Sequence, residues 1–345
     1  MGLQFKDLVV KKEIAIADLQ GKVVAIDSMN MLYQFLTTIR STDGSPLTDK
    51  NGSITSHLIG LFNRTTTLME QGLKLVFVFD GKPPAIKQKT WEKRTAVKKE
   101  ASLKLKQAAE AGDIAGMRKF ASRTAVLTKE MIIDAQNVIT ALGLPIVQAP
   151  SEGEAQTAYM VKKGDAYASV SQDYDNLIFQ CPLLVRNLSI AGKRKTAGKF
   201  AYQTVKPELI SLQDVLQNLH LDIDQLIILA ILVGTDYNPG GVKGIGPKTA
   251  LKLLQEYGHD FAALFEKVEW KKHYPDLAWK TIFDIITKIP VTDEYVLQWK
   301  PIQEKEVLKL LVERHDFSEE RVKSKLEALQ EQNEKIQQKG LGHYF

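Results

Sequence analysis

The chain has 345 residues, 44% of them apolar and 25% charged, which is the composition of a globular protein of about two structural units. Its single cysteine, Cys181, excludes an intramolecular disulfide and a zinc site built from cysteines. The longest apolar run, residues 226–233, is far shorter than the ~20 residues that span a bilayer, so we expect neither secretion nor membrane insertion.

Three short apolar runs, each followed by aspartate, predict buried parallel strands. Residues 23–26 run into Asp27, residues 74–79 run into Asp80, and residues 166–170 are followed by Asp173 and Asp175. Between the first two runs, residues 29–40 and 54–70 have the apolar periodicity of amphipathic helices. This order predicts an α/β fold with a mixed, largely parallel central sheet flanked by helices.

Residues 85–142 depart from this order of strands and helices. They are mostly charged helix formers, and their helical pattern is interrupted only around residues 111–116. We expect a helical insertion that projects from the sheet edge where the strands end. Within it, residues 82–106 carry nine basic side chains against two acidic ones, a net charge of +7, whereas the chain as a whole carries +5. Such a segment is either a solvated helix face or a surface that binds a polyanion. After residue 205 we expect helices, apart from a glycine-rich interruption at residues 234–246 and a fraying end.

The aspartates that follow the strands predict a metal site. Parallel strands bring their carboxyl ends to one edge of the sheet, where Asp27, Asp80, Asp173 and Asp175 would repel each other and raise each other's pKa. A hard divalent cation relieves this repulsion, and Mg²⁺ favours carboxylate oxygens.

Three further motifs remain ambiguous from their residues alone. Ser151-Glu152-Gly153-Glu154 is either a helix capping box or a pair of further metal ligands. Asp236 is either a ligand or a turn residue that binds its own backbone. The turn Gly244-Ile245-Gly246-Pro247-Lys248 is either a clamp for a phosphate backbone or a plain corner between two helices.

Six motifs occur in this order along the chain: AIDSMN, VFVFDGKPP, QAPSEGEAQ, SQDYDNL, LVGTDY and GVKGIGPKTA. Together they resemble the flap endonucleases, structure-specific 5′ nucleases of DNA replication and repair, and most closely the archaeal branch. The resemblance implies a helical arch over the active site and a helix–hairpin–helix element that binds DNA. It also implies a nuclease domain formed by regions 1–98 and 116–258 and joined by an arch at about 85–130, a helical region 259–336 and a tail 337–345.

The resemblance assigns roles to the ambiguous residues. It implies that two Mg²⁺ ions, for which Mn²⁺ would substitute, are held by two sets of carboxylates, the first being Asp27, Asp80, Glu152 and Glu154 and the second Asp173, Asp175 and Asp236. Lys87 and Arg94, seven residues apart at the base of the arch, would hold and polarise the scissile phosphate. A K⁺ ion is implied at the helix–hairpin–helix. The implied DNA contacts are Tyr33, Arg40, Arg64, Glu152, Gly234, Asp236, Gly244, Gly246 and Lys248.

The last eight residues match the peptide pattern that binds the sliding clamp (PCNA). In this pattern Gln338 is followed by an aliphatic residue, Leu341, and an aromatic pair, Tyr344 and Phe345. We expect this tail to be disordered in the free protein, because Gly340 and Gly342 disfavour a helix. On the clamp, its apolar side chains would fill a pocket.

These expectations amount to a Mg²⁺-dependent 5′-flap endonuclease with 5′–3′ exonuclease activity that acts on branched DNA as a monomer. It would be cytoplasmic and nucleoid-associated in an archaeon, or nuclear in a eukaryote. One alternative is a sister nuclease that cuts bubbles, gaps or four-way junctions. The other is a DNA-binding clamp adaptor without catalytic activity, for which seven carboxylates that repel phosphate would have no use.

Overall fold

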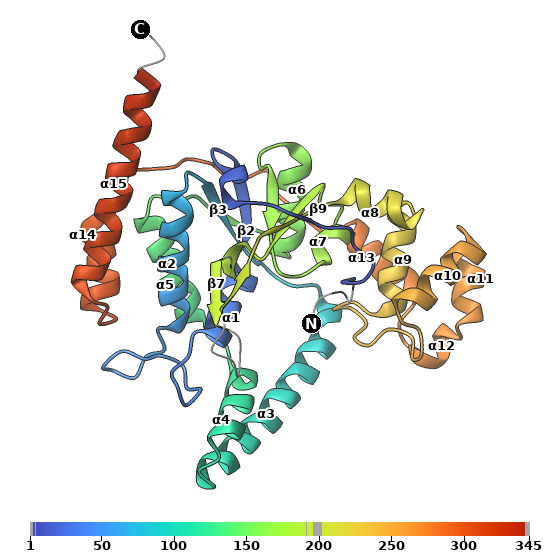
Figure 1. Ribbon diagram of the computed structural model, residues 1–345. Coiled ribbons are helices and arrows are strands. Elements are labelled where there is room, and N and C mark those ends of the chain that lie inside the picture. The colour runs from blue at the N-terminus through green and yellow to red at the C-terminus, as the bar shows by residue number, and fades with distance from the viewer. Residues whose placement is uncertain (1–2, 4, 191, 196–201, 342–345) are drawn as a thin grey trace.

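The computed structural model describes residues 3, 5–190, 192–195 and 202–341. A central sheet separates two groups of helices, and a helical hairpin projects away from it (Figure 1). The strand order is β1-β9-β6-β5-β2-β3-β4, with β2 to β6 parallel to their neighbours and the pairs β6–β9 and β9–β1 antiparallel. The predicted mixed, largely parallel sheet is therefore confirmed. The strands are β1 (Lys12–Glu13), β2 (Val23–Asp27), β3 (Lys74–Phe79), β4 (Ile146–Gln148), β5 (Ala168–Val170), β6 (Leu183–Arg186) and β9 (Glu208–Ser211).

Side chains along the central strands point alternately to the two faces of the sheet and so contribute to two layers of the core. Leu75, Phe77 and Phe79 of β3 face one cluster, and Val76 and Val78 face the other. The first layer contains α1 (Ser28–Thr38), α2 (Ser56–Glu70), α5 (Lys129–Ala141), α14 (Glu304–Leu308) with its π-helical continuation (Lys309–Glu313), and α15 (Glu319–Leu341). The second contains α6 (Gly153–Lys163). Both faces of the parallel strands are thus buried, as their continuous apolar runs predict.

The predicted helical insertion is present between β3 and β4. A 3₁₀ turn (Ala85–Lys87) leads into α3 (Gln88–Glu110), which is followed by α4 (Ile114–Ala121). The break between these two helices falls at residues 111–113, inside the interruption that the sequence predicts. The two helices pack against each other and project from the sheet edge (Figure 1).

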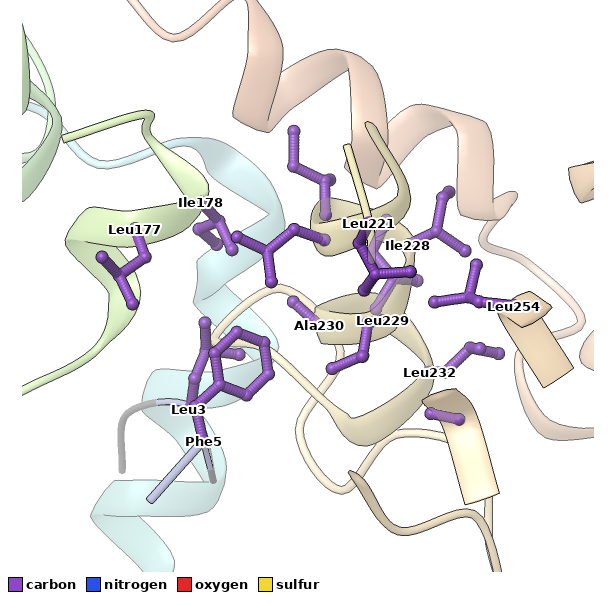
Figure 2. Close-up of a cluster of buried hydrophobic side chains, with 14 of the residues drawn as sticks. Leu3, Phe5, Leu177, Ile178, Leu221, Ile228, Leu229, Ala230, Leu232 and Leu254 are labelled. Atoms are coloured by element: carbon purple, nitrogen blue, oxygen red, sulfur yellow. The ribbon is translucent and has the colours of Figure 1, made fainter. Parts of the chain in front are cut away.

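A third cluster of buried side chains lies beside strands β6 and β9. Leu3 and Phe5 of the N-terminal segment pack there beside α7 (Asp175–Ile178) and α9 (Ile223–Val233), as Figure 2 shows. Around α9 lie α8 (Leu212–Leu219), α10 (Pro247–Tyr257), α11 (Phe261–Lys267), α12 (Trp270–His273) and α13 (Trp279–Thr287). Among the described residues no single helix is long and apolar enough to span a membrane, and the pair α8–α9 meets the length and composition criteria only jointly, across an 80° bend.

The second half of the chain departs from the predicted helical pattern in several places. Strand β9 lies where helices were predicted, and β6 and a separate hairpin of β7 (Gly192–Lys195) and β8 (Tyr202–Val205) were not predicted either, because strands of four residues carry little periodic signal. Residues 289–303, where helices were predicted, form neither helix nor strand, and Trp299 Nε1 donates to the Leu75 carbonyl at 3.0 Å. The expected disorder from Gln338 onward is wrong as far as Leu341, because α15 continues to that residue. The proposed division into regions stays a prediction.

Candidate functional site

The predicted carboxylates converge at one edge of the sheet. Asp27 ends β2, Asp80 follows β3, and Asp173 and Asp175 lie in the turn after β5 and at the start of α7. Because β2, β3 and β5 are parallel, their carboxyl ends meet at this edge. Mutual repulsion links the group: Asp27 interacts with Asp80 and Asp173, and Asp175 interacts with Asp173 and Asp236.

The two glutamates at the start of α6 join this group, and the capping-box interpretation of Ser151 is wrong. The N-cap of α6 is Glu152, and its own side chain makes no capping hydrogen bond. Asp80 instead receives a hydrogen bond from the Gly153 N–H at 2.7 Å, because α6 begins directly against the end of β3. Glu154, in the first turn, lies close enough to Asp175 and Asp27 to be repelled by both.

Lys87 is the cation of the cluster. Its Nζ lies 2.9 Å from Glu152 Oε1 and 3.5 Å from Asp236 Oδ2, and its side chain is only 13% exposed. Burial alone would lower the pKa of Lys87, but attraction to Glu152, Asp236 and Glu154 outweighs it and raises the pKa above its ordinary value. The buried Tyr237 completes this corner: its hydroxyl donates to Glu152 Oε1 at 2.8 Å, and its ring lies 5.2 Å from Lys87 Nζ.

One ammonium does not neutralise this many carboxylates. Burial, followed by repulsion from Asp80, raises the pKa of Asp27 to about 8. Burial, followed by repulsion from Asp173 and Asp236, raises the pKa of Asp175 to about 7. The pKa of Glu154 is also raised well above its ordinary value, first by desolvation and then by these neighbours. The described side chains of this site therefore hold an excess of negative charge that favours either protons or cations.

Backbone and amide groups orient the carboxylates, and the sequence did not single these groups out. Asp27 accepts from the Asn30 N–H at 3.0 Å and from Ser171 Oγ at 3.1 Å. Asn30 Nδ2 also donates to Asp173 Oδ2 at 2.9 Å, and the Leu3 N–H donates to Asp175 Oδ1 at 2.8 Å. One residue of α1 thus contacts carboxylates that follow two different strands.

The donor chemistry of this cluster fits a hard divalent cation. Its seven side chains present only carboxylate oxygens, and the raised pKa values show that they lack sufficient positive charge of their own. Within the described residues, no three of these side chains already form a set of ligands around one point. Carboxylates that repel each other are expected to stay apart until a cation draws them together.

The remaining residues predicted for the arch and for base stacking, Arg94 and Tyr33, belong to α3 and α1. Arg94 belongs to α3, although its side chain lies outside the described part of the structure. Tyr33 is 38% exposed on α1, its hydroxyl donates to the Ala125 carbonyl at 3.4 Å, and Lys98 Nζ of the arch lies 5.3 Å from its ring. An exposed aromatic ring beside a basic helix is a suitable surface for a nucleobase.

The two arginines predicted to contact DNA have their guanidinium groups bound to backbone carbonyls. Arg40 donates to the carbonyls of Leu36, Thr37 and Gly44 at 2.9–3.2 Å, which completes the C-terminal end of α1. Arg64 donates to the Leu188 carbonyl. Both side chains are half-buried, so each has a structural role in addition to the predicted one.

The predicted phosphate-binding glycines fall into two environments. Gly234 has φ +114°, and a Cβ there would lie 2.6 Å from the Gly241 nitrogen, so this glycine closes a tight loop beside Asp236. Gly244 and Gly246 are exposed, and a Cβ on either would meet nothing within 4 Å. Gly246 is the N-cap of α10, Pro247 opens the helix as predicted, and Lys248 is exposed in its first turn.

The predicted clamp-binding residues are only partly described. The backbone of Gln338 and Leu341 belongs to α15, and their side chains are outside the described part of the structure. Tyr344 and Phe345 lie outside the described residues altogether. Their assigned role stays a prediction.

Comparisons with known proteins identify the family. Residues 3–101 match the model of the XPG N-terminal domain, and residues 143–236 match that of the XPG I-region. Flap endonuclease 1 of Pyrococcus abyssi is 51% identical over 345 residues, which cover 100% of this chain and 98% of the relative. The protein of Pyrococcus furiosus is 50% identical, with 100% and 99% covered.

Solved structures agree with this assignment. The structure of flap endonuclease-1 from Methanococcus jannaschii is similar with a TM-score of 0.74 and 42% identity over 96% of this chain and 98% of that one. The catalytic core of Rad2 in complex with DNA substrate shares the fold, with a TM-score of 0.69 at 22% identity over 95% of this chain and 100% of that one. The chain therefore belongs to the flap endonuclease 1 family of DNA nucleases.

Proposed function

We propose that this protein is a Mg²⁺-dependent, structure-specific endonuclease that removes 5′ flaps, with an associated 5′–3′ exonuclease activity. The observation that carries the proposal is the convergence of seven carboxylates and Lys87 at one sheet edge, at the base of a helical hairpin whose segment 82–106 carries nine basic residues. Polyanionic DNA would bind the basic hairpin, and the carboxylates would hold the ions that make hydrolysis possible.

Two sets of residues would hold two Mg²⁺ ions, or Mn²⁺ in their place. The first set is Asp27, Asp80, Glu152 and Glu154, and the second is Asp173, Asp175 and Asp236. Such ions would activate the attacking water and stabilise the charge on the leaving oxygen. Burial of Asp27, Glu152 and Asp175, which are 3%, 6% and 7% exposed, excludes bulk water and strengthens every electrostatic interaction there.

Lys87 and Arg94 would bind the scissile phosphate from the side of the arch. Lys87 ends the 3₁₀ turn that connects Asp80 to α3, so its ammonium lies between the carboxylates and the arch. Tyr237 and Glu152 hold it there. A preorganised cation at a phosphate whose charge increases in the transition state accelerates the reaction.

The rest of the molecule supports binding to branched DNA. The exposed turn 244–248 leaves its backbone open to approach, as a clamp for duplex phosphates requires, with a K⁺ ion as a bridging cation. Tyr33 offers an exposed ring beside Lys98 of the basic helix α3. We further propose that the protein acts as a monomer in replication and repair, where DNA is processed, and that its tail from Gln338 to Phe345 binds a sliding clamp. The compartment would be the cytoplasm of an archaeon or the nucleus of a eukaryote.

Two alternatives are less well supported. A sister nuclease for bubbles, gaps or four-way junctions shares the fold, yet relatives at 50% and 51% identity over the whole chain are flap endonucleases. A DNA-binding adaptor without catalytic activity would have no reason to bury carboxylates whose charge repels phosphate.

The test is the cleavage of four substrates by the wild-type protein and by Asp175→Ala. We expect wild-type protein with Mg²⁺ to cut a 5′ flap in preference to a bubble, a four-way junction and a blunt duplex, with product ends mapped at the branch. Asp175→Ala should lose cleavage and keep flap binding, because it removes a ligand and not a phosphate contact. Cleavage by the variant near the wild-type rate would refute the metal assignment.

A further inference from the structure

The short helix α7 positions two of the proposed metal ligands. Asp175 is its first residue, and Asp173 lies two residues earlier. On one side, Leu177 and Ile178 pack near Leu3, Phe5 and the residues of α9, as Figure 2 shows. A helix of four residues does not fix its own position, so its remaining contacts decide where Asp173 and Asp175 lie.

Asn176 contacts elements on the other side of α7. Its side chain is fully buried, and Nδ2 lies 2.9 Å from Ser169 Oγ of β5, 3.0 Å from Thr157 Oγ1 of α6 and 3.2 Å from the Glu154 carbonyl oxygen. Its Oδ1 has no hydrogen-bond partner among the described residues, so the hydrogen bonds of this amide are all donated toward α6 and β5.

The acceptors of Asn176 are themselves connected. Ser169 Oγ donates to Thr157 Oγ1 at 2.9 Å, and Thr157 Oγ1 donates to the Glu154 carbonyl at 2.9 Å. Thr157 and Ser169 are both fully buried. The network therefore connects the backbone of Glu154, a proposed ligand of one ion, to the residue next to Asp175, a proposed ligand of the other.

We propose that Asn176 is a positioning residue that holds the two sets of carboxylates at a fixed separation. It joins the first turn of α6 to α7 through a buried network that contains none of the ligand carboxylate groups. The inference rests on the proposed function, since it concerns the same site. Its consequence is specific: without Asn176, the ligands remain but their preorganisation is lost, so divalent cations bind more weakly.

The experiment compares Asn176→Leu with the matched variant Gln156→Leu. Gln156 is also a fully buried amide, and it lies on α6. Its side chain exchanges two hydrogen bonds of 2.8 Å with the backbone of Thr292 instead of binding α7 or β5. Mn²⁺ binding is measured by calorimetry without DNA, thermal unfolding is measured without metal, and flap cleavage is measured across a Mg²⁺ titration.

We expect both variants to unfold at lower temperature, because each loses buried hydrogen bonds. Only Asn176→Leu should bind Mn²⁺ about 10- to 100-fold more weakly, the usual cost of losing a residue that orients metal ligands. Its Mg²⁺ requirement for cleavage should rise by a similar factor, with flap binding unchanged. Equal Mn²⁺ affinities in the two variants would show that Asn176 only stabilises the fold, and would overturn the proposal.

Two further variants keep the test decisive. If Asn176→Leu does not fold, the double variant Thr157→Val/Ser169→Ala removes the acceptor hydroxyls and should also weaken Mn²⁺ binding; wild-type affinity in it overturns the proposal. Asp175→Ala reports on the function itself. If Asp175→Ala loses cleavage while Asn176→Leu and Gln156→Leu bind Mn²⁺ equally well, only the proposed role of Asn176 is refuted. Cleavage by Asp175→Ala near the wild-type rate would instead refute the proposed function.

Discussion

Substitution of Lys87 by methionine tests the electrostatics of the site directly. Methionine has nearly the length of lysine but no charge, so Lys87→Met removes the ammonium that lies 2.9 Å from Glu152 and 3.5 Å from Asp236. In the absence of metal, both carboxylates lose this nearby positive charge. Removing one partner of a buried ion pair costs about 3–5 kcal/mol, and we expect the lower end because a neighbouring carboxyl group can take up a proton.

This cost converts to a change in unfolding temperature. A chain of 345 residues, at about 2.1 cal/mol/K per residue, has an unfolding entropy of roughly 0.7 kcal/mol/K. A loss of about 3 kcal/mol therefore lowers the Tm of the metal-free protein by about 4 °C. Mg²⁺ should recover most of this loss, because it supplies the positive charge that the carboxylates lack. The Tm increase on adding Mg²⁺ is thus expected to be larger for Lys87→Met than for wild type.

The measurement is calorimetric unfolding at pH 8 with chelator and with saturating Mg²⁺. Lys104→Met is the control, since it removes a lysine of the same insertion whose partner is the exposed Glu100 at 2.5 Å, and it should shift Tm by no more than about 1 °C. Flap cleavage by Lys87→Met at saturating Mg²⁺ should still be slower by about 10²–10³. An equal Mg²⁺-dependent shift in wild type and Lys87→Met would refute the reasoning.

Three further predictions concern the proton binding of the carboxylates, the lysines of α3 and the C-terminal tail. Because the pKa values of Asp175 and Asp27 are raised to about 7 and 8, the folded metal-free protein binds more protons than the unfolded chain. Its unfolding free energy should therefore fall as pH rises from about 4 to 8. Over pH 6–9 the Mn²⁺ affinity measured by calorimetry should increase, because the carboxyl groups lose the protons that compete with the cation. Replacing Lys98, Lys99, Lys104 and Lys106 by glutamine should reduce the salt dependence of flap binding and leave the single-turnover rate of bound substrate unchanged. An equal loss of binding and of rate would refute the view that these lysines only bind DNA. Tyr344→Ala/Phe345→Ala should lose clamp-stimulated cleavage and keep basal activity, whereas a lower Tm with lost basal activity would contradict the clamp assignment.

The sequence predicts those parts of the site that local patterns determine. Apolar runs that end in Asp27 and Asp80 indicate both the strands and the edge at which they end, and parallel pairing brings these carboxylates together. The Ser151–Glu154 motif was compatible with two interpretations, and only the packing of α6 against the end of β3 excludes the capping box. Its chemistry was recognisable from the family resemblance, but its local geometry was not.

Residues that act through distant contacts could not be predicted from their neighbours in sequence. Asn30 contacts Asp173 across 143 residues, and Tyr237 contacts Glu152 across 85. Nothing in the local composition distinguishes such side chains from other buried or half-buried polar groups, because their partners are fixed by the strand order. The same holds for residues 289–303, which are held by hydrogen bonds to Gln156, Gly143 and Leu75 and not by a strand pattern of their own.

Under the proposed function, Lys87 lies where metal binding and substrate binding would meet. Its ammonium is bound to Glu152 Oε1 and Asp236 Oδ2, and the Tyr237 hydroxyl donates to the same Glu152 oxygen. A phosphate near this corner would meet carboxylates whose charge Lys87 only partly offsets. Once cations satisfy the carboxylates, the same ammonium can donate to phosphate oxygen without leaving them unpaired. We therefore infer that divalent cations make Lys87 available to the substrate. Phosphate affinity in this corner should then depend on metal in the wild type and much less in Lys87→Met.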